Sequence, residues 1–415
     1  MNRTKSSSKT HSAKLPALSI SLVILTIFFI QACESDSSTI HSQIAQSIEN
    51  TESVEPMRLD GQWLLEPYGD VMLNPQTSGL KYHNGKLYSL SDASADRSQI
   101  KRLHEIDMDS AKITQKFGPS SVHERVQNSC FYDYLQNAPD YEALVPVHDN
   151  LASANAQSTW VFVTEDASRV APLSPACQTK FAATGSTLYP TLLVRMEVNG
   201  ASLELTHVRA VQFPTKKNLG NNSFVEVGDF PNDGIEGLAL TRDGKLLLGL
   251  EKDAAGQPRV FSINMNEDFW LQDGFAVAKD TELLLPKFES GNHPINGMDV
   301  YYPDDESRGY LLAAARNDNE LWVIDLAKEK ATKRIKLAFT APSRFADNPD
   351  SRCEARYLMN NASIEGLAVA NGSIWMVNDP WKINYMKNVQ CEADAATFEK
   401  MAPLIFQMPV ASLGL

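Results

Sequence analysis

The segment EGLALTRDGKLLLGLEKD, residues 236–253, contains two short apolar runs on either side of an Asp243-Gly244 turn signal. Such runs flanking Asp-Gly predict an antiparallel β-hairpin. Four further segments begin in the same way, with a small, amide or acidic residue, then Gly or Ala, then Leu or Met, and they also end in Asp. These are residues 78–92, 142–166, 296–318 and 365–379. Internal repetition at this interval predicts a repeat architecture.

Each predicted hairpin is followed by two more strand-like runs, such as KRLHEIDM at residues 101–108 and KITQKFG at residues 112–118. Four antiparallel strands per repeat, arranged around an axis, form a β-propeller. We therefore predict an all-β fold with five blades, while the 94-residue interval between the second and third openings leaves room for a sixth. The strand-like residues 62–73, before the first hairpin, are expected to close the ring against the final blade.

The first 33 residues have the pattern of an export signal. Four basic residues, at positions 3, 5, 9 and 14, precede an apolar run over residues 15–30, and Cys33 follows Gln31 and Ala32. This order is typical of a secretory signal peptide, and the approach to Cys33 resembles the lipobox of bacterial lipoproteins. We expect a signal peptide over 1–32, a flexible tether over 33–57 with a lipid on Cys33, and the propeller over 58–415. A plain membrane anchor is the alternative.

The composition limits the classes of partner that this protein can bind. The formal net charge of −13 and the sequence pI of about 5.1 argue against nucleic acid. The sequence contains no G-x-S-x-G, H-E-x-x-H, P-loop or G-x-G-x-x-G motif. Glu34 after Cys33 resembles lipoproteins sorted to the outer membrane. We expect a monomer in the cell envelope that reaches the membrane through the lipid on Cys33.

The four remaining cysteines are expected to form two disulfides. Cys130 and Cys177 lie in the loops that enter and leave the second hairpin, and Cys353 and Cys391 stand in the same relation to the fifth. Four cysteines allow three pairings. Because antiparallel strands bring the entering and leaving loops to one end of a blade, we predict Cys130 with Cys177 and Cys353 with Cys391.

The hairpin repeat also predicts where the functional groups gather. The first strand of a hairpin starts at the edge where the second strand ends, so all five openings and all five terminal acids collect at one mouth of the central channel. The inner ring of candidate metal ligands is Ser78, Glu142, Glu236, Asn296 and Glu365. The outer ring of candidate catalytic acids is Asp92, Asp166, Asp253, Asp318 and Asp379, with His293 as a further candidate acid or base.

A converging set of carboxylates predicts a cation. Close carboxylates repel one another by ~1 to 4 kcal/mol per pair. Calcium accepts six to eight oxygen ligands in irregular geometry and suits an all-oxygen ring better than zinc. Basic residues recur just beyond the second strands and are candidates for phosphate binding or, alternatively, for charge compensation of the acidic rim. They are Arg97, Arg169, Lys252, Arg316 and Lys382.

The repeat openings resemble those of two propeller families. Glu236-Gly237-Leu238-Ala239 and Glu365-Gly366-Leu367-Ala368 resemble the blade openings of the exported phytase-like esterases. The inner-ring order, and residues 78–92 in particular, are similar to the five-bladed calcium-activated nucleotidases, or apyrases. Asn296 departs from that pattern, where a serine stands, and the Asp-Asp-Arg-Thr-Gly stretch after the first hairpin is missing.

The resemblance implies an exported, calcium-dependent hydrolase that acts on a small phosphate ester or anhydride. Hydrolysis of a lactone or carboxyl ester, as in other calcium propellers, is a further possibility. The residues leave open whether the protein is catalytic at all. The alternative is a propeller that binds a ligand or protein at the mouth and uses calcium only to hold the blades together.

Overall fold

The computed structural model describes residues 55–118, 121–137, 139–165, 173–181, 190–214, 234–251, 253, 255–305 and 307–415. Residues 55–415 form one compact unit. The predictions for Cys33, Asp166, Arg169 and Lys252 lie outside the described residues. Among the helices described, none combines the length and the apolar character needed to cross a membrane.

The fold is an all-β propeller, as predicted. Five antiparallel sheets each start with a hairpin and continue outward. In chain order their strands are β2 (Thr77–His83), β3 (Lys86–Ser91), β4 (Leu103–Ile106) and β5 (Ile113–Phe117); β7 (Tyr141–Val147), β8 (Ser158–Thr164), β9 (Leu192–Asn199) and β10 (Ser202–Gln212); β11 (Ile235–Leu240), β12 (Lys245–Leu250), β13 (Arg259–Asn264) and β15 (Lys279–Asp280); β16 (Gly297–Tyr301), β17 (Tyr310–Ala315), β18 (Glu320–Asp325) and β19 (Lys333–Pro342); and β21 (Ile364–Ala370), β22 (Ser373–Asn378) and β23 (Leu404–Pro409).

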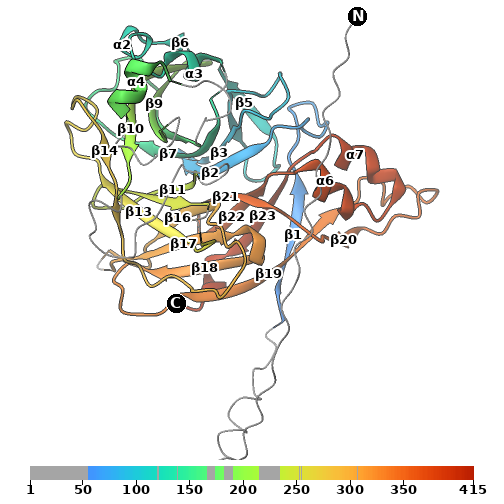
Figure 1. Cartoon of the computed structure of the whole chain (residues 1–415). Coiled ribbons are helices and arrows are strands. Elements are labelled where there is room, and N and C mark those ends of the chain that lie inside the picture. The colour runs from blue at the N-terminus through green and yellow to red at the C-terminus, as the bar shows by residue number, and fades with distance from the viewer. Residues whose placement is uncertain are drawn as a thin grey trace, which may run out of the picture. The chain divides into compact units, whose positions relative to one another are not determined.

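The first strands of these sheets surround the axis. They contact one another in the cyclic order β2, β7, β11, β16, β21 and back to β2. Figure 1 shows their labels gathered at the centre of the unit. β7 and β11 touch directly, so among the described residues no further sheet stands between them in the long second interval.

The N-terminal strand closes the ring. β1 (Met57–Trp63) pairs antiparallel with β23 and so supplies the fourth strand of the last sheet. The predicted closing strand covered residues 62–73, whereas the observed strand ends at Trp63 and shares only residues 62 and 63 with that range. β1 also pairs in parallel with β19, which joins the fourth and fifth sheets into one nine-stranded sheet that includes β20 (Arg356–Leu358).

The hairpin turns have the chemistry that the sequence predicts. Asn84 and Gly85 both have positive φ, as do Asn371 and Gly372. A two-residue turn with positive φ at both positions matches the right-handed twist of the strands it joins. These turns lie at the end of the propeller opposite the mouth.

Glycines of the repeat allow the inner strands to approach closely. A Cβ added at Gly366 would lie 2.7 Å from the carbonyl carbon of Gly79, and one added at Gly297 would lie 2.9 Å from that of Gly366. Neither glycine has a positive φ, so packing around the axis, not backbone conformation, requires the missing side chain. The repeated small residue is therefore explained by the architecture.

The hydrophobic core lies between neighbouring sheets. Leu80 and Leu87 of the first sheet pack in one buried cluster with Val377 and Ile405 of the last. Burial of these side chains on both faces of each sheet accounts for their nearly continuous apolar runs.

Short helices and two strands elaborate the second and fifth sheets. Beside the second sheet lie β6 (Ser121–Val122), α2 (Glu124–Gln127), α3 (Tyr132–Asn137), α4 (Pro175–Phe181) and β14 (Ala276–Val277). The fifth sheet carries α6 (Lys382–Tyr385), η2 (Met386–Asn388), η3 (Glu392–Asp394), α7 (Ala395–Glu399) and η4 (Val410–Leu413), and the short helix η1 (Arg316–Asp318) follows β17 of the fourth sheet. The disulfides Cys130–Cys177 and Cys353–Cys391 fix these additions, which confirms both predicted pairings.

Candidate functional site

The strand register defines which residues are equivalent in the five sheets. Gly366 pairs with Val377, Gly237 with Gly249, Ala143 with Val163 and Gly297 with Ala314. Two residues beyond each of these partners stand Asp379, Glu251, Glu165 and Arg316, and Asp92 holds this place in the first sheet. The second ring of the mouth is therefore Asp92, Glu165, Glu251, Arg316 and Asp379.

This register corrects the predicted outer ring. The sequence prediction placed Asp253 and Asp318 in the ring, whereas the register gives Glu251 and Arg316, each two residues earlier; Asp166 lies outside the described residues. The physical cause is that the second strands of the hairpins end differently: the third and fourth reach this ring with Glu251 and Arg316, two residues before the predicted Asp. A β-bulge also interrupts the pairing at the opening of four hairpins, and bulges re-aim side chains. In three of these hairpins the bulged residue is itself an inner-ring acid, Glu142, Glu236 or Glu365.

The five predicted inner-ring residues are all buried. Ser78, Glu142, Glu236, Asn296 and Glu365 expose between 0% and 8% of their surface. Ser78 Oγ donates a hydrogen bond of 3.2 Å to Glu142 Oε2. Asn296 is fully buried, and neither atom of its side-chain amide has a hydrogen-bond partner in the described part of the chain.

Two triads of carboxylates occupy the mouth. In the first, oxygens of Asp140, Glu142 and Glu165 all lie within 4.8 Å of one another, and in the second those of Glu165, Glu236 and Glu251 do. Glu165 belongs to both. The closely spaced carboxylates are thus concentrated on the second and third sheets and are less symmetric than a five-membered ring around the axis.

Arg316 is the one cation among the ten ring positions. Its Nη2 lies 3.1 Å from Glu251 Oε1, and its Nη1 contacts Glu365 Oε1. The guanidinium therefore bridges the third and fifth sheets. It compensates the charge of Glu251, at one end of the second triad, whereas the first triad forms no ion pair with it in the described part of the chain.

Burial and crowding shift the titration of these acids. Burial, then the charges of Glu236 and Asp140, raise the pKa of Glu142 well above its usual range. Burial and Glu251 raise the pKa of Glu236, although Arg316 opposes them. Burial, Asp379 and Asp140 raise that of Asp92, and burial raises the pKa of Asp379 to about 7 against the effect of Arg316. The chain alone therefore stabilises the charged forms poorly.

Several predicted residues are engaged elsewhere. Asp253 accepts backbone N–H groups of Ala255 and Gln257 and pairs with Arg259 at 3.1 Å, as a loop-stabilising aspartate does. His293 Nδ1 lies 3.0 Å from Asp318 Oδ1, and its ring stacks on Phe288 at 3.4 Å. Neither pair is a member of the two triads.

Among the predicted basic residues that the structure describes, Arg316 alone pairs with carboxylates of the mouth. Arg97 is exposed, and its positive charge helps to lower the pKa of the neighbouring Asp96. Lys382 pairs with Glu399 at 3.5 Å, and both side chains are exposed.

Sequence reasoning missed Asp140 as a member of the site. Its Oδ1 accepts a hydrogen bond of 3.0 Å from the backbone N–H of Ala93, so it links the first and second sheets at the mouth. The sequence feature that could have identified Asp140 is its position two residues before Glu142, because alternate residues of an extended segment lie on the same side.

The donor set fits a hard divalent cation. Two oxygens of one calcium shell stand at most roughly 4.6 to 5.2 Å apart, so three oxygens that all lie within 4.8 Å of one another can share one ion. Carboxylate, amide and hydroxyl oxygens dominate the ring, and zinc would prefer His or Cys ligands. The unpartnered Asn296 Oδ1 and Glu365 Oε2 are further buried acceptors.

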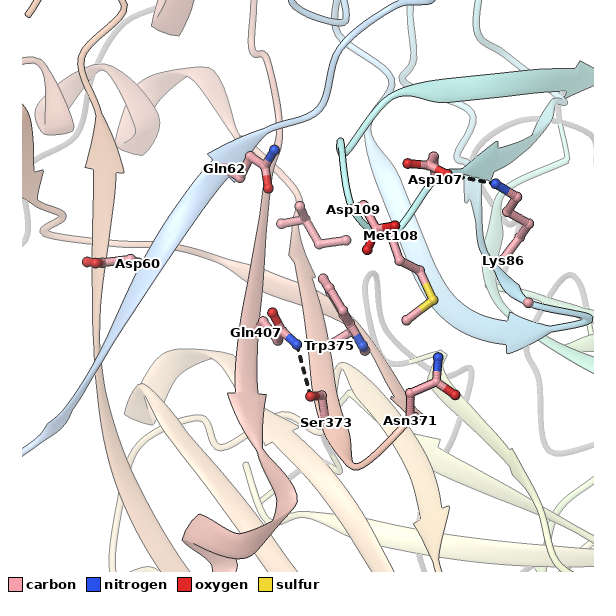
Figure 2. A pocket seen from close by; sticks show the side chains of 12 residues that line it. Asp60, Gln62, Lys86, Asp107, Met108, Asp109, Asn371, Ser373, Trp375 and Gln407 are labelled. Carbon is pink, nitrogen blue, oxygen red and sulfur yellow. Dashed lines mark hydrogen bonds and ion pairs between the residues drawn. The ribbon is translucent and has the colours of Figure 1, made fainter.

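A cavity of about 560 Å³ opens at the other end of the propeller, between the first and last sheets. Figure 2 shows Trp375 within it, below Met108 and beside Gln407 and Asn371. Its charged groups are largely paired: Lys86 Nζ lies 2.7 Å from Asp107 Oδ2. Gly85 and Asn371, which line this cavity, belong to hairpin turns, so the cavity lies away from the carboxylates of the mouth.

Comparisons with known proteins leave the family open. No family model and no curated protein matches the chain. Among solved structures, a DUF4221-family member from Bacteroides vulgatus is 10% identical, covers 85% of this chain and 96% of its own, and has a TM-score of 0.36. Virginiamycin B lyase from Staphylococcus aureus is 11% identical, with coverage of 85% and 89% and a TM-score of 0.29. Likenesses this distant carry no argument, and the fold rests on the strand topology itself.

Proposed function

We propose that this protein is an exported, lipid-anchored propeller that binds calcium at its mouth and hydrolyses a small phosphate ester or anhydride. The observation that carries the proposal is the two triads of carboxylates that contain Glu142 and Glu236, together with the buried, unpartnered amide of Asn296 in the same ring of repeat positions. Buried charges of one sign are costly unless a counterion compensates them. A divalent cation supplies that compensation.

Export is supported by the signal-like N-terminal sequence and by the two disulfides, which form and persist in oxidising compartments. The lipid on Cys33, anchoring in the outer membrane and the monomeric state belong to the same proposal and rest on the sequence alone.

The metal would be held by oxygens of Glu142, Glu236 and their triad partners, with Asn296 as a further ligand. When bound, calcium supplies a fixed positive charge that polarises a phosphoryl group. Arg316 would hold a phosphate oxygen through its remaining donors. Asp92 and Asp379, at the second ring, would accept a proton from the attacking water.

A second candidate function has its own support. The inner-ring acids expose at most 8% of their surface, and Arg316 ties the third sheet to the fifth. Both features suit a structural ion in a propeller that binds a ligand or protein without turnover. Calcium would then act only to hold the sheets together.

The test combines metal binding with turnover. The purified full chain is stripped with EDTA and titrated with CaCl₂ by calorimetry, and phosphate release is followed from p-nitrophenyl phosphate, a nucleoside triphosphate and phytate, with a lactone as a separate substrate. Calcium-dependent phosphate release that is lost in Glu236→Gln supports the hydrolase. Calcium binding that raises the melting temperature without turnover supports the binding propeller, and absence of calcium binding refutes both.

A further inference from the structure

A second pocket lies on the outer edge of the second sheet. It has a volume of about 410 Å³ and is formed by α2, α4, the strand β10 and the loop that leads to β14 (Figure 1). Its lining shares no residue with the two carboxylate triads. A binding site here would therefore be independent of the mouth.

The walls of this pocket are held rigidly by bonds from three directions. The Cys130–Cys177 disulfide ties the segment after α2 to α4. β14 pairs with β10 and brings the loop 270–274 alongside. Arg209 of β10 donates hydrogen bonds of 2.6 Å to the carbonyls of Phe269 and Phe275. Loops fixed in this way on a sheet scaffold are suited to hold a ligand.

The pocket is basic in an acidic protein. Its lining contains Arg125, Lys180 and Arg209, whereas Asp273 is its one carboxylate and is exposed. Arg209 is 6% exposed, and its hydrogen bonds go to backbone carbonyls and to no carboxylate of the described chain. Burial, with no acidic neighbour, lowers its pKa. A positive charge fixed under the pocket attracts an anion.

The walls also offer aromatic surface and a spare donor. Phe131, Phe181 and Trp270 line the pocket. Trp270 is 4% exposed, and its indole Nε1 has no hydrogen-bond partner in the described part of the chain. His207, beside it, is kept uncharged because burial and the nearby Arg195 lower its pKa to about 4. The pocket therefore combines aromatic surface with an uncharged imidazole.

We propose that this pocket, bounded by Arg125, Lys180, Arg209 and Trp270, binds a small organic anion that carries an apolar or aromatic body. The anionic group is a carboxylate or a phosphate, which both accept hydrogen bonds from guanidinium, ammonium and indole N–H donors. The volume lies within the range of small-molecule sites.

Titration of the EDTA-treated full chain by calorimetry tests this proposal. The probes are benzoate, phenyl phosphate and inorganic phosphate, and EDTA removes any anion binding that depends on a metal at the mouth. We expect saturable binding of benzoate or phenyl phosphate, weakened about tenfold by Arg125→Gln or Lys180→Gln because each removes a charge-assisted hydrogen bond. The exposed Lys336→Gln, on β19, is the matched control and should bind as the wild type does.

The probes separate the outcomes. Tighter binding of phenyl phosphate assigns a phosphate ester, and tighter binding of benzoate assigns a carboxylate. Trp270→Phe, which keeps an aromatic ring but loses the N–H, should weaken either. Inorganic phosphate binding as tightly as phenyl phosphate would overturn the apolar part of the proposal. No saturable binding of either aromatic probe, or equal binding by the Arg125 and Lys180 variants and the wild type, would overturn it entirely.

Discussion

Replacing Glu236 by Gln should change the stability of the protein in opposite directions with and without calcium. Oxygens of Glu236, Glu165 and Glu251 lie within 4.8 Å of one another. At that separation two unit charges repel by about 1 kcal/mol in water and by about 3 kcal/mol at an effective dielectric constant of 20. Gln keeps the shape of the side chain and removes its charge.

In EDTA we therefore expect Glu236→Gln to be more stable than the wild type by about 1 to 3 kcal/mol. Burial and the charge of Glu251 raise the pKa of Glu236, so this carboxyl is partly protonated. The gain in stability is therefore smaller than the summed repulsion of Glu236 with Glu165 and with Glu251. For a unit spanning residues 55–415 this raises the melting temperature by roughly 1 to 4 °C. In calcium the order should reverse, because an ion at one thousand times its Kd stabilises the wild type by about 4.1 kcal/mol and Glu236→Gln loses that binding.

The assay is thermal unfolding followed by circular dichroism in EDTA and in CaCl₂. Glu267→Gln, an exposed residue away from the mouth, is the control and should shift little in either condition. A Glu236→Gln variant that is less stable than the wild type in EDTA would refute the charge-repulsion reasoning. Equal stabilisation of both proteins by calcium would show that Glu236 is no ligand.

Three further predictions concern packing, covalent links and pH. Gly366→Ala should cost about 1 to 3 kcal/mol, because the new Cβ would meet Gly79 at 2.7 Å, and an unchanged urea midpoint would contradict the packing of the inner strands. Removing the Cys353–Cys391 disulfide with a double Ser variant should cost ~4 kcal/mol in the free energy of unfolding for a sequence separation of 38, measured in urea without reductant; a loss below ~1 kcal/mol would be too small for the chain-entropy account. Burial lowers the pKa of His104 to about 3, so between pH 6.5 and 3 the unfolded chain binds the proton and the folded one does not. The free energy of unfolding should fall by up to ~1.4 kcal/mol per pH unit on acidification through that window, and less steeply in His104→Gln. Urea denaturation at pH 7, 5.5 and 4.5 checks this, and an equal loss of stability in the wild type and the variant would argue against a role of His104.

Part of the candidate site could be predicted because its signal is local. The inner-ring residues stand at the start of a repeated motif, and Glu142, Glu236 and Glu365 are indeed buried at neighbouring positions around the axis. The second ring could not be predicted in the same way. Its members depend on where the second strand of each hairpin ends at the mouth, and the third and fourth strands of this kind reach it with Glu251 and Arg316, two residues before their Asp.

The sequence by itself determined the hairpin repeat, the turn positions and the disulfide partners. Each depends on residues within a single hairpin and its flanking loops, such as Asn84-Gly85, where chain connectivity alone brings the groups together. The tertiary structure alone decided that Arg316 joins Glu251 to Glu365, that β1 pairs with both β23 and β19, and that a basic pocket forms beside β10. These features join residues far apart in the chain, and the free energy of packing between sheets, which no local pattern encodes, selects them.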